Sequence, residues 1–207
     1  MLFSCNPSDS KKATIIKNEQ DRTALPNSSN KRKDSIFRRS TDTLLLMNTS
    51  TEILSAIKIR NYKKLISFIH PHNGIRFSPY AYIDTTTDRK FLGDELLKLA
   101  NQNKKINWNS GWDEKPELLT VHQYFSNFVY DVDFLTAELK SVNEFHSQGT
   151  DLNNIAEVYP GCDVVEFFFA GFEKKYEGMD FRGLRLVFKM QDNTAYLIGV
   201  VHDKWTP

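Results

Sequence analysis

The chain has 207 residues, a mass of 24.0 kDa and a formal net charge of +1, with 40% hydrophobic and 26% charged residues. This length suits one domain with a substantial core, with or without a tail. The balanced charge does not indicate nucleic acid as a partner. No stretch approaches the ~20 apolar residues that a helix needs to cross a bilayer.

The first forty residues differ in composition from the rest. They hold nine Lys or Arg against four Asp or Glu, with Ser, Asn and Pro and no apolar period. This excess of five positive charges leaves the remainder at about −4, so the basic character is local. Such a composition is typical of a disordered tail or tether. We therefore expect residues 1–42 to be a tail and residues 43–207 to form a single domain.

The extreme N-terminus, Leu-Phe-Ser-Cys at residues 2–5, resembles the cleavage box of bacterial lipoproteins. In that class the cysteine becomes the lipidated first residue, which implies a lipid anchor on Cys5 and a location in the bacterial cell envelope. The charged and apolar segments that precede such a box are missing, which implies a start upstream of Met1. The alternative is an ordinary N-terminus with a chance cysteine, and a cytoplasmic protein.

Helical periodicity follows the tail. Thr49 and Glu52 have the spacing of a capping box, and apolar residues then recur at helical intervals. This pattern predicts one long or kinked amphipathic helix that ends before Pro71. Further helices are predicted over residues 88–100 and 120–130.

The segments between these helices carry weaker signals. Residues 74–82 look extended, and residues 107–116 look like a loop beside a short strand. Residues 135–142 would form either a strand or the continuation of a helix, and residues 149–154 are rich in turn formers.

Two histidines that flank a proline, His70 and His72, resemble a metal chelate only superficially. The proline forces a bend, and no third ligand lies nearby in the sequence, so we expect no metal site and no cofactor. A histidine that ends a helix and is favoured by the helix dipole explains His70 better than a metal site does.

Three segments near the C-terminus alternate apolar and other side chains with period two, which is typical of strands with one buried face. They are residues 163–170, 183–190 and 195–201. Asp192 and Asn193 lie between the last two and suit a tight turn. The simplest arrangement is an antiparallel meander that ends in a hairpin.

Helices first and an antiparallel sheet last define an α+β fold class. Residues 53–205 resemble the cone-shaped fold of the nuclear transport factor two and ketosteroid isomerase superfamily. That resemblance implies N-terminal helices packed on a strongly curved antiparallel sheet. More narrowly, the segments GIRFSPY (74–80), FVYD (128–131) and YLIGVVHDKW (196–205) resemble a group of bacterial envelope lipoproteins with no established activity.

Two residues are candidate proton carriers. A histidine near a carboxylate suits acid or base chemistry, which makes His202 a candidate, although a strand-end histidine that hydrogen-bonds the backbone is the favoured interpretation. Adjacent strand residues point to opposite faces, so His202 and Asp203 should not form a dyad. The superfamily resemblance implies that a lone, desolvated Asp131 would serve as a base, as in the isomerase branch.

Aromatic residues with polar tips suit a pocket or an interface. Two arginines within apolar strands would each need a partner if buried, and Glu166 is a structural candidate for Arg185. The expected ligand-binding residues are Arg76, Tyr80, Tyr82, Tyr130, Arg185 and Trp205.

Two functions follow from these observations. The first is a non-catalytic module of an envelope lipoprotein that binds a small apolar molecule or a partner protein. It would contact the membrane only through its lipid anchor, and a homodimer is one arrangement that the sequence allows. The alternative is an isomerase- or cyclase-like enzyme that uses Asp131 or His202. A deep cavity with either group unpaired would favour the enzyme, whereas paired or exposed groups would favour binding.

Overall fold

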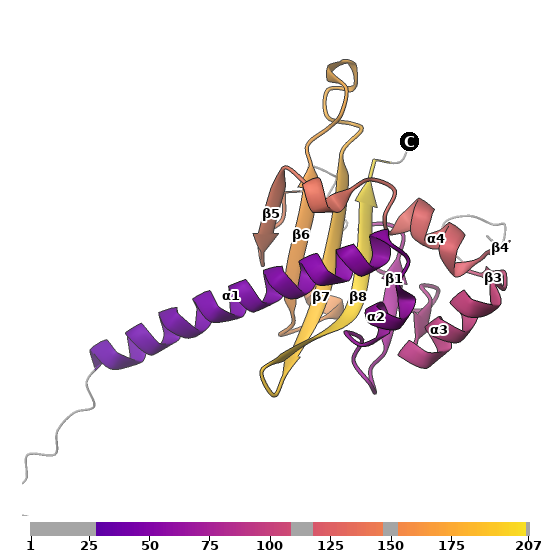
Figure 1. Ribbon diagram of the computed structural model, residues 1–207. Helices are drawn as coiled ribbons and strands as arrows, with labels where there is room; N and C mark the ends of the chain where they lie inside the picture. The colour runs from indigo at the N-terminus through magenta and orange to yellow at the C-terminus, as the bar shows by residue number, and fades with distance from the viewer. Residues whose placement is uncertain (1–27, 109–117, 147–152, 206–207) are drawn as a thin grey trace, which may run out of the picture.

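The computed structural model describes residues 28–108, 118–146 and 153–205, with side chains from residue 42 onward (Figure 1). Cys5 and its predicted lipidation lie outside these ranges, as does most of the turn-rich segment 149–154. The elements, in chain order, are α1 Ser28–Lys58, α2 Tyr62–Ile66, β1 Ile75–Ser78, β2 Lys90–Phe91, α3 Gly93–Gln102, β3 Ile106–Asn107, β4 Leu118–Leu119, α4 Val121–Phe128, the 3-10 helix η1 Phe134–Thr136, β5 Leu139–Val142, α5 Ile155–Val158, β6 Asp163–Phe169, the 3-10 helix η2 Lys174–Tyr176, β7 Arg182–Gln191 and β8 Thr194–Lys204.

The predicted α+β class is confirmed, and the C-terminal meander matches its sequence pattern closely. Strands β6, β7 and β8 pair antiparallel in succession. The hairpin between β7 and β8 turns at Asp192 and Asn193, whose φ angles of 50° and 59° are both left-handed. This is the geometry that a two-residue turn needs to follow strand twist. A register shift between Val187 and Phe188 interrupts the β7–β8 ladder at a bulge, a device that bends a strand.

The sheet is mixed, which corrects the predicted antiparallel sheet. Its order is β2-β1-β8-β7-β6-β5, and β1 pairs parallel with β8, with Arg76 opposite Gly199. The remaining pairs are antiparallel, and the sheet is open at its β2 and β5 edges. Side-chain alternation predicts which face of a strand is buried but contains no information about its neighbour. The parallel pair joins the first strand of the chain to the last one.

Helix α1 begins at Ser28, well before the predicted start. Thr49 and Glu52 therefore lie inside the helix rather than in a capping box, and the hydroxyl of Thr51 donates to the carbonyl of Met47. Adding residues to an existing helix costs much less free energy than nucleating a new one. The packed C-terminal half of α1 can therefore extend as a helix into the basic segment that was expected to be a tail. In Figure 1, α1 crosses the sheet and extends past its β5 edge.

The long or kinked helix expected to end before Pro71 is divided into two. Helix α1 ends at Lys58, Arg60 adopts a left-handed φ of 59°, and α2 starts after Asn61, whose side chain accepts from the amide of Lys64. A non-glycine residue in this region ends a helix sharply. The division places Arg60 at a corner between two helices.

The remaining predictions were mixed in outcome. Helix α4 was predicted well: Thr120 caps it and shares a reciprocal capping box with Gln123. Helix α3 begins only at Gly93, because the preceding Lys90–Phe91 is strand β2. The undecided segment 135–142 contains strand β5 after a short 3-10 turn.

Both faces of the sheet are covered, by layers of unequal size. The face that carries Leu184 and Val200 packs against α1, α4 and the aromatic cluster around Phe77. The opposite face carries Val187 and packs against Ile83 and the short helix α5. No helix in the described ranges is long and apolar enough to cross a membrane.

Candidate functional site

The segment that follows α4 brings titratable side chains against the end of the sheet. Asp131 accepts from Nε2 of His202 at 2.9 Å and from Nε of Arg182 at 2.8 Å, through its two different carboxylate oxygens. Arg182 and His202 lie on the neighbouring strands β7 and β8, on the face that packs against α1 and α4. The side chain of His202 has no exposed surface, and its ring lies edge-on to Phe134.

The pairing determines the charge of Asp131. Burial raises the pKa of this carboxyl, but hydrogen bonds and charge from His202 and Arg182 outweigh burial and hold that pKa below its usual range. Asp131 is thus an ionised, doubly paired carboxylate rather than a lone desolvated base.

His202 and Asp203 point to opposite faces of β8, as strand geometry predicts. Asp203 accepts from Nη2 of Arg185 at 2.8 Å, on the face away from His202. Nε of Arg185 donates to Oε1 of Glu166 at 2.9 Å, so the expected Arg185–Glu166 pair is present. The Arg185 side chain is fully buried between its two carboxylates.

His146 is a member of this network that the sequence did not single out. Its backbone amide donates to Oε2 of Glu166 at 2.5 Å, and its ring Nδ1 lies 3.2 Å from the same oxygen. The guanidinium of Arg185 also lies over the ring of Phe145, 5.2 Å from its centroid. Only the tertiary structure brings residues 145 and 146 to β6, so no local sequence signal would have found them.

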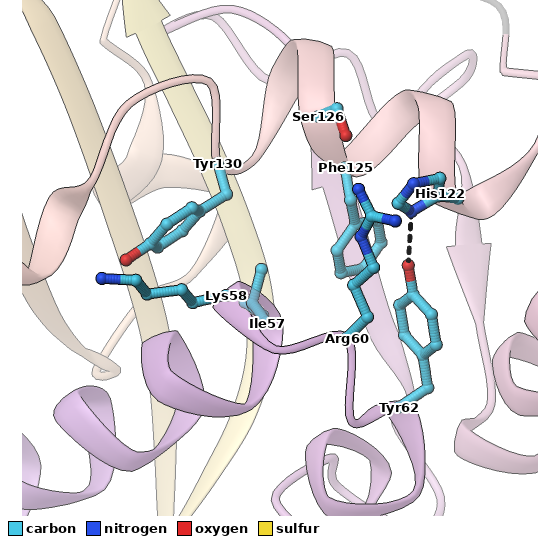
Figure 2. Close-up of a pocket in the computed structure, with 8 residues that line it drawn as sticks. All are labelled: Ile57, Lys58, Arg60, Tyr62, His122, Phe125, Ser126 and Tyr130. Carbon is cyan, nitrogen blue, oxygen red and sulfur yellow. Dashed lines mark hydrogen bonds between the residues drawn. The ribbon is translucent and has the colours of Figure 1, made fainter.

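A small cleft of about 110 Å³ lies where α1 ends beside α4 (Figure 2). Tyr130, which directly precedes Asp131 in the sequence, borders the cleft, and its hydroxyl donates to Asp133 at 2.5 Å. Asp133 also accepts a hydrogen bond from Nζ of Lys58 at 2.7 Å. The lining consists of Ile57, Lys58, Arg60, Tyr62, His122, Phe125, Ser126 and Tyr130.

The six expected ligand-binding residues lie in different environments, and of these only Tyr130 lines the cleft. Arg185 is buried, Tyr80 is partly buried, and Tyr82 and Trp205 are 41% and 50% exposed. Nη1 of Arg76 donates to two backbone carbonyls of the loop after β1, those of Thr85 and Asp88. The described residues therefore do not bring these six side chains into one concavity.

His70 closes a turn. Its Nδ1 accepts from the amides of His72 and Asn73 at 3.2 and 3.0 Å, so its Nε2 donates to Gln191 at 3.2 Å. Helix α2 ends earlier, at Ile66, so the predicted helix-dipole explanation is replaced by this turn. Among the described residues, no three His, Cys, Asp or Glu side chains gather as metal ligands would.

Comparisons of the chain with protein-family models, with curated proteins and with solved structures found no match. Fold and site therefore define the class of protein by themselves. The chain forms an α+β domain with an open mixed sheet, with its candidate acid and base groups hydrogen-bonded to each other and with a small polar cleft at a helix corner.

Proposed function

We propose that the chain is a non-catalytic binding module. The observation that carries this proposal is the engagement of both candidate proton carriers: Asp131 binds His202 and Arg182 at once, and His202 is fully buried. A general acid or base needs a hydrogen bond to its substrate. Asp131 is engaged by His202 and Arg182, and Nε2 of His202 is engaged by Asp131.

The partner that we favour is a protein, of which a second copy of this chain is one example. Pockets for small apolar molecules usually enclose ~300–1,000 Å³. The cleft offers about 110 Å³, and cationic and hydroxyl side chains border it. Both properties argue against the small apolar molecule that the sequence also suggested.

We also propose that the domain is an open variant of the cone-shaped fold of the nuclear transport factor two superfamily. The support lies in helices packed across one face and in a bulged hairpin at the centre of the sheet. The parallel β1–β8 pair sets it apart from a sheet that is antiparallel throughout.

The proposal predicts a structural role for Asp131. We expect Asp131→Asn to lower the free energy of unfolding by about 1–3 kcal/mol, because the guanidinium of Arg182 would lose its charged partner. Urea denaturation at pH 7 measures this, with the exposed Glu138→Gln as a control that should stay within about 0.5 kcal/mol of the parent. Equal midpoints for Asp131→Asn and the parent would contradict the structural role.

The envelope location is likewise a proposal, carried by the Leu-Phe-Ser-Cys motif. When the chain is expressed with its upstream codons in a bacterium, we expect mass spectrometry to find diacylglycerol on the Cys5 sulfur and cleavage before it. Cys5→Ser should abolish both, while Cys162→Ser should not. An unmodified Cys5 in the parent would remove the tether from the proposal.

One observation favours the alternative, an isomerase- or cyclase-like enzyme. Nδ1 of His202 is buried, and no described residue hydrogen-bonds to it. Burying a ring nitrogen without a hydrogen-bond partner costs free energy, and a catalytic role is one reason for a protein to retain such a group. If Asp131→Asn left stability unchanged, this enzyme would become the better hypothesis.

A further inference from the structure

The corner between α1 and α2 places an arginine in the cleft described above. Arg60 has a left-handed φ of 59°, and Figure 2 shows its guanidinium beside the ring of His122 and directed toward Ser126 on α4. His122 and Ser126 are four residues apart, so they lie on the same side of this helix. Three groups that can donate hydrogen bonds thus face one small space.

One of the two positive charges at this space has no counter-charge among the described residues. Of its two basic residues, Lys58 is paired with Asp133. The guanidinium of Arg60 has no hydrogen bond or ion pair with any residue in the described ranges, and the lining contains no carboxylate. A guanidinium in such a position attracts an anion.

We infer that the cleft binds the oxyanion group of a phosphate or carboxylate ligand, held by Arg60, His122 and Ser126. The planar guanidinium offers paired N–H donors that match two oxygens of such a group. The hydroxyl of Ser126 and a ring N–H of His122 supply further donors. This names a ligand class that the proposed binding function does not require.

The size of the cleft agrees with this class. A volume of about 110 Å³ is a few times the ~30 Å³ that one water molecule occupies in the liquid. It accommodates a single phosphate or carboxylate group and no drug-sized molecule. Lys58 and Arg60 are exposed residues, so the group would enter from solvent.

The cleft also provides a measurable signal, the pKa of His122. Burial and the positive charge of Arg60 lower the pKa of this imidazole. Burial raises the pKa of Tyr62, and the charge of Arg60 opposes this rise. The hydroxyl of Tyr62 lies 3.5 Å from Nδ1 of His122. An anion beside the guanidinium would cancel its repulsion and raise the His122 pKa.

The test is an NMR titration of the histidine rings in the full chain, with the His122 signal assigned by its loss in His122→Gln. Inorganic phosphate and acetate are added separately at constant ionic strength set with chloride. We expect at least one of them to give a saturable rise in the His122 pKa, and the two arms distinguish phosphate from carboxylate recognition.

Arg60→Asn, which suits a left-handed φ, should weaken this binding at least tenfold. Arg89→Gln, at an exposed arginine elsewhere, should not.

A non-saturable response, or equal responses in Arg60→Asn and Arg89→Gln, would overturn the inference. A second measurement keeps the test valid if a substitution changes the stability of the fold. Adding the anion should raise the melting temperature of the parent and leave that of Arg60→Asn unchanged. The outcome is independent of the Asp131→Asn experiment, so failure of one proposal is distinguishable from failure of the other.

Discussion

Replacing Arg185 with methionine is expected to lower the free energy of unfolding by about 3–5 kcal/mol, the largest effect of any single change considered. The guanidinium lies fully buried between Glu166 and Asp203, at 2.9 and 2.8 Å. Methionine fills a similar length of the core but leaves two carboxylates on one face of the sheet without their cation. Removing one member of a buried ionic network costs far more than the network contributes, because the remaining charge stays desolvated.

The measurement is urea denaturation of the variant and parent at pH 7. Lys189→Met is the matched control, because it removes a cation from the same strand at a partly exposed position, and it should cost much less. A triple variant with Glu166→Gln and Asp203→Asn beside Arg185→Met should recover part of the loss, since no buried charge remains unpaired. A loss below about 1 kcal/mol for Arg185→Met alone would contradict the buried network.

The second large effect is a dependence of stability on pH that Asp88 introduces. Burial raises the pKa of this carboxyl from 3.8 to about 6, although hydrogen bonds from Ser78 and the Asp84 amide and the charge of Arg76 oppose the change. The hydroxyl of Ser78 donates to Oδ2 of Asp88 at 2.5 Å, and the amide of Asp84 donates to the same atom at 3.0 Å. Asp88 itself is 7% exposed.

The sign follows from linkage. The folded state holds the proton more tightly than the unfolded state, so the contribution of Asp88 is complete below pH 3.8 and is lost as pH rises through about 6. The loss amounts to about 2–3 kcal/mol, because each unit of pKa difference corresponds to ~1.4 kcal/mol. An asparagine side chain at this position would not titrate, so the stability of Asp88→Asn relative to the parent should increase by this amount between pH 4 and 7.

Denaturation curves at several pH values for both proteins isolate this contribution, since other carboxylates contribute equally to each. Ser78→Ala removes a hydrogen bond that lowers the pKa of Asp88, and should therefore move the transition to higher pH. A difference between Asp88→Asn and the parent that stays constant from pH 4 to 7 would show that Asp88 does not titrate in this window.

Local sequence signals predicted strands well and helix boundaries less well. The alternation in β6, β7 and β8 is visible because one face packs against the main apolar core, whereas the other buried face also holds the charged Glu166, Arg185 and Asp203. The start of α1 was missed because helical backbone continues from a packed segment into a polar one, without a composition signal at the boundary. A kink was allowed for, but its position at Arg60 was missed because a left-handed arginine has no local signature.

Of the candidate site, the sequence predicted individual residues but few of their partners. It placed His202 and Asp203 on opposite faces and paired Arg185 with Glu166, since both follow from period two and from the cost of burying charge. It left open whether Asp131 is paired and named no partner for it, because His202 and Arg182, which Asp131 meets, lie more than fifty positions away. Arg60 and His122 were not considered together because they belong to different segments of the chain.

The amino-acid sequence alone determined the α+β class, the C-terminal hairpin and the inward face of each long strand, because these depend on side chains two or four positions apart. Only the tertiary structure decided that β1 runs parallel to β8, that Asp131 is paired, and that an arginine without an ion-pair partner among the described residues borders a small cleft. Those features depend on contacts between distant segments, which are selected by the packing of the whole core.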